Sequence, residues 1–200
     1  MVSSILANGG RSCLNASGVW TPQHGRDIAE ALAERLAAVP ALPADHPDAQ
    51  LAAFANPKVA ESISATIDRE LGEPGAADVT QDLRRSPRLV ALCRCRYLLP
   101  TIIWCPDRGH SLASREFLFP FASVVECPAG QIAAAIGPTL VATAITADRR
   151  FADSLMASPN VDRLNLGPVP TWRISWDQPH EGNLFELLYR QRAFQIEPAA

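Results

Sequence analysis

The sequence lacks the features that mark several classes of protein. Its five cysteines include no C-x-x-C pair, so a zinc ribbon or a disulfide framework is poorly supported and a reducing compartment is expected. No stretch offers the roughly 18 consecutive apolar residues of a transmembrane helix. The opening MVSSILANGG has neither the basic region nor the apolar core of a secretion signal. We therefore expect a cytoplasmic protein with no membrane-spanning segment.

An excess of charge of one sign is also missing. The formal net charge is -3, with acidic and basic residues interspersed, so neither a nucleic-acid groove nor an acidic tail is indicated. A small molecule or a protein is the expected partner.

Two hundred residues at 48% hydrophobic can bury one sizeable core. The 17 prolines are spread along the chain rather than gathered in a linker, so residues 1–200 are predicted to form a single domain.

The first half of the chain shows helical periodicity. Apolar residues recur every four positions over 26–39, which predicts a helix that Pro40 ends. A second helix is predicted at 57–71, because Asn56-Pro57 supplies an N-cap and a preset first turn. Between these helices, residues 41–54 are expected to form a loop that runs into a short helix.

The second half consists of short apolar runs separated by short helical patterns. Runs of this length, rich in β-branched residues, predict buried strands. The expected strands are residues 89–93, 97–105, 121–127 and 139–146. The expected helices are residues 131–136, 149–158 and 183–195. Strands alternating with helices predict an α/β fold, a three-layer domain whose helices cover a mostly parallel sheet.

Cys13 has the most distinctive setting of the cysteines. It follows the paired glycines Gly9-Gly10, whose backbone can bend tightly enough for amide N–H groups to converge on the sulfur or on an adjacent oxyanion. Arg11 adds a nearby positive charge, which favours the nucleophilic thiolate form. From the residues alone, both a nucleophile and a buried structural cysteine remain open.

Two other cysteine arrangements are weaker candidates. Cys93 and Cys95 would share one face of a strand, with Cys105 a strand away. Because a fourth metal ligand at useful spacing is missing, we expect structural burial of these three cysteines and no metal. A pairing of Cys13 with His180 would make a cysteine hydrolase, a hypothesis that no local motif supports.

An ordered series of motifs resembles the aldehyde dehydrogenase superfamily, in its C-terminal domain with the catalytic cysteine. Gly10-Arg11-Ser12-Cys13 is similar to the active-site segment G-Q-x-C. The series continues in the family's order with Leu99–Ile103 for P-T-[ILV]-[ILV], Glu116–Pro120 for E-[IL]-F-G-P, Ile136–Leu140 and Thr143–Asp148 for Y-G-L and the strand ending in T-x-D, Asp162–Asn165 for G-x-[VI]-x-x-N, and Pro179–Gly182 for P-F-G-G. The resemblance extends from residue 6 to about 195.

The resemblance implies a reaction and its residues. Cys13 would be the nucleophile that adds to an aldehyde, and its own backbone N–H would be one oxyanion donor. The hemithioacetal would give a hydride to NAD or NADP, and water would hydrolyse the resulting thioester. Glu116, by composition alone an ordinary solvated loop acid, would hold the nicotinamide-side ribose. Leu118 would line the same pocket.

Departures from the family pattern mark a divergent branch. Arg11 replaces Gln, Leu118 replaces Phe, Phe119 replaces Gly and His180-Glu181 replaces Phe-Gly, so the preferred aldehyde is not carried over. A complete member also has a cofactor-binding domain with a phosphate site, a general-base glutamate and an oxyanion-hole asparagine, for which there is no room before Cys13. We therefore expect a catalytic half that works with a separate cofactor-binding chain. The alternative is an inactive interaction or structural protein, and an exposed catalytic face could also promote homo-oligomers.

Overall fold

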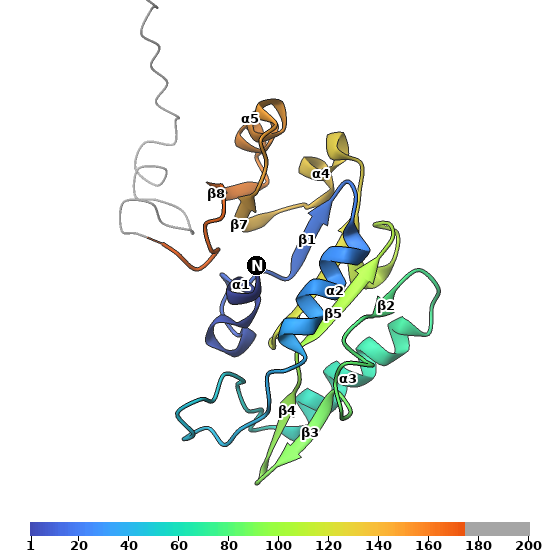
Figure 1. Cartoon of the computed structure of the whole chain (residues 1–200), viewed down its shortest axis with the longest axis vertical. Coiled ribbons are helices and arrows are strands. Elements are labelled where there is room, and N and C mark those ends of the chain that lie inside the picture. The colour runs from blue at the N-terminus through green and yellow to red at the C-terminus, as the bar shows by residue number, and fades with distance from the viewer. Residues whose placement is uncertain (175–200) are drawn as a thin grey trace, which may run out of the picture.

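The computed structural model describes residues 1–174, which form a sheet covered by helices and two smaller pairs of strands (Figure 1). The predicted helix at 183–195 and His180 lie outside the described residues. The helices are α1 (Val2–Leu6), α2 (Gly25–Leu36), α3 (Pro57–Leu71), α4 (Ala129–Ala135) and α5 (Arg149–Ala157), with short 3-10 helices η1 (Ala7–Gly10) and η2 (Ser111–Ser114). The strands are β1 (Gly18–Thr21), β2 (Ala77–Asp78), β3 (Leu89–Leu92), β4 (Cys95–Leu98), β5 (Thr101–Cys105), β6 (Phe121–Glu126), β7 (Thr139–Ala144) and β8 (Val161–Leu166).

The central sheet has the strand order β1-β6-β5-β2. Strand β6 pairs in parallel with β1 on one side and β5 on the other. Strand β2 adds a short antiparallel edge, with Asp78 opposite Ile103. The prediction of a mostly parallel sheet in an α/β fold is therefore confirmed.

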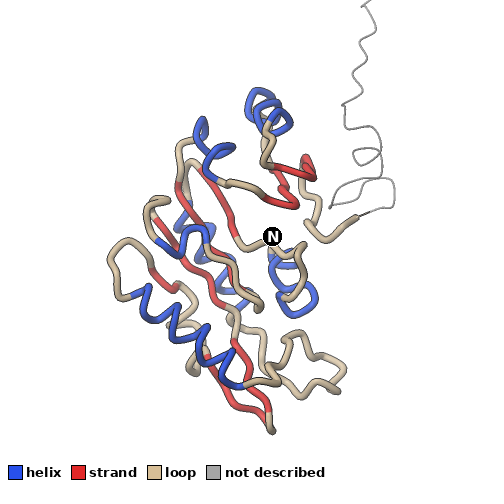
Figure 2. The backbone as a smooth tube through the Cα atoms, turned by 180° about the vertical axis from the view of Figure 1, so that it is seen from behind, coloured by secondary structure: helices blue, strands red, loops and turns tan. Residues whose placement is uncertain are grey.

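Helices cover both faces of this sheet. Consecutive strand residues point to opposite faces, and Ile102 packs with Leu32 of α2 while Ile103 packs with Ile67 of α3. Figure 1 shows α2 in front of the sheet, and the reverse view in Figure 2 shows α3 on the opposite side. The three predicted layers are thus α2, the sheet and α3.

Side-chain acceptors fix the first residues of α2 and α3. Asn56 caps α3, its side-chain oxygen accepting a hydrogen bond from the Lys58 amide at 3.1 Å, and the predicted range 57–71 is confirmed. The first amide of α2, on Gly25, donates to the Glu126 carboxylate at 2.8 Å. The end of β6 therefore fixes the start of α2.

Three details of the predicted elements are wrong. The helix predicted at 26–39 ends at Leu36, before Pro40 is reached. Residues 41–54 contain no helix; this proline-containing segment stays irregular, and Phe54 at its end bridges to Arg96 of β4. The run 97–105 is not one strand, because the chain breaks between β4 and β5 at Pro100, which has no N–H to give to a strand ladder. Strands β3 and β4 form a separate antiparallel hairpin.

A smaller unit follows β6. Strands β7 and β8 pair in parallel, and α4 and α5 lie beside them. Asp148 caps α5 by accepting from the amides of Arg150 and Phe151. The predicted strand at 139–146 and the helices at 131–136 and 149–158 are confirmed within one or two residues. Within residues 1–174, no helix has both the length and the apolar character needed to cross a bilayer.

Candidate functional site

Cys13 lies in a turn between η1 and β1, and its side chain is exposed. Asn15 organises this turn. Its side-chain oxygen accepts from the Ser12 amide at 2.6 Å, and its side-chain nitrogen donates to the carbonyls of Ser4, Ile5 and Ala7. The side-chain amide of Asn15 therefore bonds the free carbonyl groups at the end of α1 and also holds the turn that carries the Cys13 thiol.

The glycines before Cys13 allow a close contact with a distant segment. Gly9 and Gly10 have φ of +61° and +73°, values that glycine adopts without steric cost. A Cβ on Gly10 would lie 2.2 Å from the Phe119 carbonyl carbon and the Pro120 nitrogen. The loop before Cys13 thus packs directly on the backbone of residues 116–120.

Arg11 ties the same two segments together. Its Nε donates to the Leu118 carbonyl at 3.4 Å, and its other guanidinium nitrogen donates to the Ala52 carbonyl at 3.4 Å. The guanidinium also lies 4.2 Å from the centre of the Phe54 ring. Arg11 therefore fastens the Cys13 loop to its neighbours, and that its charge also favours the thiolate stays a prediction.

Glu116 and Leu118 point outward from the segment that Gly10 contacts. Both are exposed, Leu118 to 61%, while the alternate residues Phe117 and Phe119 turn inward. The Phe117 ring meets Phe121 edge-on at 4.8 Å. The aromatic residues anchor the segment and leave an acid and an apolar side chain on its surface.

The other end of this segment is fixed to α3. Arg115 pairs with the buried Glu70 carboxylate at 2.6 Å, and the Ser111 hydroxyl donates to the same group at 2.8 Å. Burial acts to raise the pKa of Glu70, but the hydrogen bonds from Arg115 and Ser111 and the charges of Arg115 and Arg69 outweigh it, so this pKa is lowered. An ion pair immediately before Glu116 therefore fixes where that loop begins.

The structure thus brings together the segments that carry Cys13, Glu116 and Leu118. His180, which the hydrolase hypothesis pairs with Cys13, lies outside the described residues. His24 pairs with Asp27 at 3.3 Å, and His110 contacts the Glu70 carbonyl at 3.1 Å. Over residues 1–174, no group of three or more His, Cys, Asp and Glu side chains is placed to hold a metal ion.

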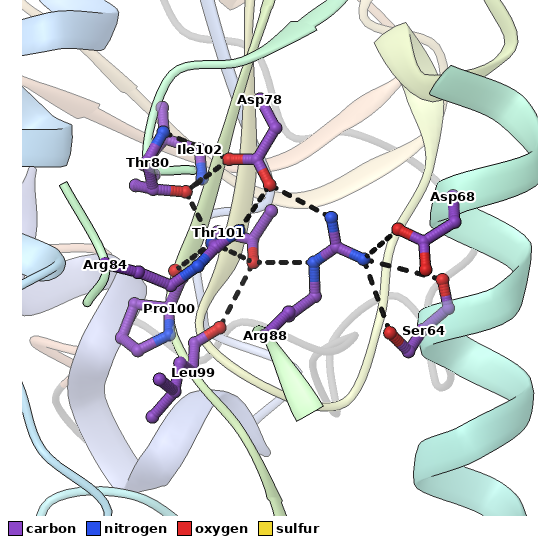
Figure 3. Close-up of polar contacts among 10 residues, drawn as sticks. All are labelled: Ser64, Asp68, Asp78, Thr80, Arg84, Arg88, Leu99, Pro100, Thr101 and Ile102. Carbon is purple, nitrogen blue, oxygen red and sulfur yellow. Dashed lines mark hydrogen bonds and ion pairs between the residues drawn. The ribbon is translucent and has the colours of Figure 1, made fainter. Parts of the chain in front are cut away.

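Figure 3 shows a buried polar network that the sequence analysis missed. The Asp78 carboxylate contacts Arg84 at 2.6 Å and Arg88 at 2.9 Å, and all three side chains are at most 6% exposed. Thr80 hydrogen-bonds the same carboxylate. Arg84 and Arg88 also donate to the Thr101 hydroxyl.

This network joins the central sheet to α3. Arg88 reaches Asp68 of α3 at 2.8 Å, and Arg84 donates to the Pro100 carbonyl at 3.0 Å. Burial acts to raise the pKa of Asp78, but the Arg84 charge and the hydrogen bonds from Thr80, Arg84 and Arg88 outweigh it and lower that pKa. Asp78 and Asp68 balance the charges of Arg84 and Arg88, although the Arg84 Nε has no hydrogen-bond partner among the described residues, so the network joins these elements and leaves little for a ligand to bind.

Comparison with known proteins identifies the fold. No protein-family model matches the sequence, and no curated protein does. Solved structures do match: lactaldehyde dehydrogenase from Escherichia coli has a TM-score of 0.68 at 19% identity, over 82% of this chain and 34% of that one. The chain has the fold of part of an aldehyde dehydrogenase.

Further aldehyde dehydrogenases match to the same degree. The NAD+ complex of the Bacillus cereus enzyme has a TM-score of 0.67 at 16% identity, over 82% of this chain and 33% of that one. The NAD+ complex of the Mycobacterium tuberculosis enzyme has a TM-score of 0.65 at 17% identity, over 87% and 35%. The chain therefore spans about a third of the length of these aldehyde dehydrogenases.

Proposed function

We propose that this chain contributes the nucleophile of an NAD(P)-dependent aldehyde dehydrogenase, with Cys13 attacking the aldehyde. The observation that carries this proposal is the contact between the Gly10 backbone and Phe119-Pro120. It joins the two segments to which the sequence resemblance assigns the nucleophile and the ribose contact. Cys13, Glu116 and Leu118 are all exposed around that contact, as side chains that meet a substrate or cofactor must be.

The chemistry begins with the Cys13 thiol. Its sulfur gives its proton to water and bonds to the carbonyl carbon of the aldehyde, and the carbonyl oxygen takes up the negative charge. The Cys13 backbone N–H donates to that oxygen. After a hydride has left the carbon, Cys13 holds the acyl group as a thioester. Water then cleaves the carbon–sulfur bond, releasing a carboxylic acid and restoring the thiol.

The residues near Cys13 fit one end of the cofactor. Bound NAD(P) would accept the hydride; the Glu116 carboxylate can accept hydrogen bonds from the ribose hydroxyls, and Leu118 offers apolar surface. The start of α2 does not offer a phosphate site, because the Glu126 carboxylate already accepts from the Gly25 amide there. We therefore assign the phosphates to a separate cofactor-binding domain, in another chain or elsewhere in a longer polypeptide.

Reconstitution tests this function. The chain is mixed with a candidate cofactor-binding domain, and reduced cofactor is followed by absorbance over a panel of aldehydes. We expect turnover that Cys13→Ser abolishes and Cys93→Ser, a matched change of another exposed thiol, leaves intact. A further variant, Glu116→Gln, should raise the KM for the cofactor.

Two results would contradict this function. Turnover that survives Cys13→Ser would exclude Cys13 as the nucleophile. A folded complex that binds cofactor but shows no turnover with any aldehyde would favour the alternative, a non-catalytic interaction protein.

A further inference from the structure

The turn between β3 and β4 contains two cysteines in an unusual setting. Leu92 pairs with Cys95 as the last pair of the hairpin, so Cys93 and Arg94 form the two-residue turn. Cys93 is exposed and Cys95 half-buried. The prediction of burial in a strand is therefore wrong for Cys93, where the chain reverses, while Cys95 lies half-buried in β4.

The backbone of Cys93 is strained. Its φ is +54°, in the left-handed region that glycine or asparagine usually occupies in a two-residue hairpin turn. A cysteine at such a position stores strain of the kind that gathers at functional sites. Cys93 thus combines a strained backbone, an exposed thiol and a second thiol two residues away.

The separation of the two cysteines along the chain is compatible with a disulfide. Residues two apart span at most about 7 Å in an extended chain and less across a turn, while disulfides join Cα atoms about 4.4–6.8 Å apart. Cys95 packs against the buried cluster of Leu51, Tyr97 and Leu99, so the second thiol is held in place while Cys93 lies in the turn.

The base of the hairpin is held while its tip is open. The Phe54 amide donates to the Arg96 carbonyl at 2.7 Å, and Tyr97 and Leu98 are 2% and 1% exposed. By contrast, Cys105 and Cys127 are buried.

We propose that Cys93 and Cys95 form a thiol–disulfide exchange site that reacts with low-molecular-weight disulfides. The Cys93 sulfur, after losing its proton, attacks one sulfur of the small disulfide, forming a mixed disulfide and releasing one small thiol. The Cys95 sulfur then attacks Cys93, closing the Cys93–Cys95 bond and releasing the second small thiol. The protein loses two electrons and two protons, and the small disulfide is reduced to two thiols.

The ring closed by Cys93 and Cys95 is small, so its disulfide is strained and easily reduced. Excess small thiol reverses both steps. The site thus responds to the ratio of small disulfide to small thiol. This inference does not depend on the proposed dehydrogenase function, since neither step uses Cys13.

Exchange with glutathione disulfide tests the site. The reduced full chain is incubated with it, blocked with N-ethylmaleimide, cut with trypsin and mapped by mass spectrometry. We expect the peptide ending at Arg94 to stay joined to Cys95-Arg96 until reductant is added. In Cys95→Ser, the reaction should stop at a lasting mixed disulfide between Cys93 and glutathione. In Cys93→Ser, the joined peptides should not be found. Cys13→Ser, the control, should give them at the wild-type yield.

Three outcomes would overturn the proposal. In one, the wild type accumulates the same lasting mixed disulfide on Cys93 as Cys95→Ser does. In another, both thiols are recovered with the maleimide while Cys13 alone has reacted. In the third, Cys93 is bridged to a second copy of the chain rather than to Cys95. Circular dichroism of each variant checks that the fold is retained.

Discussion

At the scale of single residues, Gly10 decides whether the Cys13 loop and the Glu116 segment can meet. Gly10→Ala adds a Cβ that would lie 2.2 Å from the Phe119 backbone and also strains a positive φ. We expect it to lower the free energy of unfolding by about 3 kcal/mol, measured by urea denaturation.

Gly137→Ala is the matched control for that change. Gly137 has a similar φ of +64° with nothing within 4 Å of the added Cβ, so only the backbone strain of about 1 kcal/mol should appear. Equal losses in the two variants would mean that the contact with Phe119 contributes nothing.

Around Cys13, the sequence suggests a chemistry that stays a prediction, and it does not show the contacts that hold the loop. Paired glycines ahead of a cysteine are visible in the sequence, and the motif resemblance singled out Glu116 and Leu118. The contact between this loop and residues 118–120 was not visible, because the two segments are far apart in the sequence. Arg11 and Leu118, which hydrogen-bond across the contact, lie 107 residues apart. Burial was confirmed for Cys105 and wrong for Cys93, since an apolar run next to Cys93 hid the hairpin turn.

At the scale of elements, the Asp78 network links β2, β5 and α3. Asp78→Asn removes the negative charge that two buried arginines share. Because uncompensated buried charge is strongly destabilising, we expect a loss of about 3 kcal/mol in the free energy of unfolding.

Asp68→Asn is the control for this network. Asp68 contacts Arg88 at 2.8 Å, but the Asp68 side chain is 65% exposed. Asp68→Asn should therefore lower the free energy of unfolding by less than about 1 kcal/mol. If Asp78→Asn were as mild as Asp68→Asn, the network would not be holding the elements together.

Elements with strong local signals were predicted well. The apolar spacing and the Asn56 cap gave α3 to the residue. Strand β2 was missed because two residues carry no periodicity, and its place is set by pairing with β5. The Asp78–Arg88 contacts likewise depend on how the chain folds back, which local patterns do not reveal.

At the scale of the whole molecule, the free energy of unfolding should fall as the solution becomes acidic. The pKa values of Glu70 and Asp78 are lowered in the folded state, so their contribution is fully present above the unfolded pKa values of about 4. It is lost as the pH falls through the lower folded values. Urea unfolding between pH 7 and pH 2 should show this decline, and Glu70→Gln should make it shallower. A free energy of unfolding that rises on acidification would contradict the assignment.

The 200-residue chain alone should bind NAD(P) weakly. In the proposed function, Glu116 and Leu118 meet the nicotinamide end of the cofactor, whereas the first amide of α2 already bonds Glu126. Orientation of a dinucleotide requires its phosphates to be held as well. Calorimetric titration with NAD and NADP should therefore show no micromolar binding. Micromolar binding by the chain alone would mean that it holds the phosphates itself.

The most direct test of the account is the relative reactivity of the thiols in the folded chain. Burial and the nearby Asp107 charge raise the pKa of Cys105 to about 12, so that thiol should be inert near neutral pH, and Cys127 is buried. The informative comparison is between Cys13 and the exposed Cys93. We predict that iodoacetamide, followed by peptide mapping, labels Cys13 fastest, and that an added aldehyde slows labelling at Cys13 but not at Cys93. Faster labelling of Cys93, or equal labelling of Cys13 with and without aldehyde, would contradict Cys13 as the nucleophile.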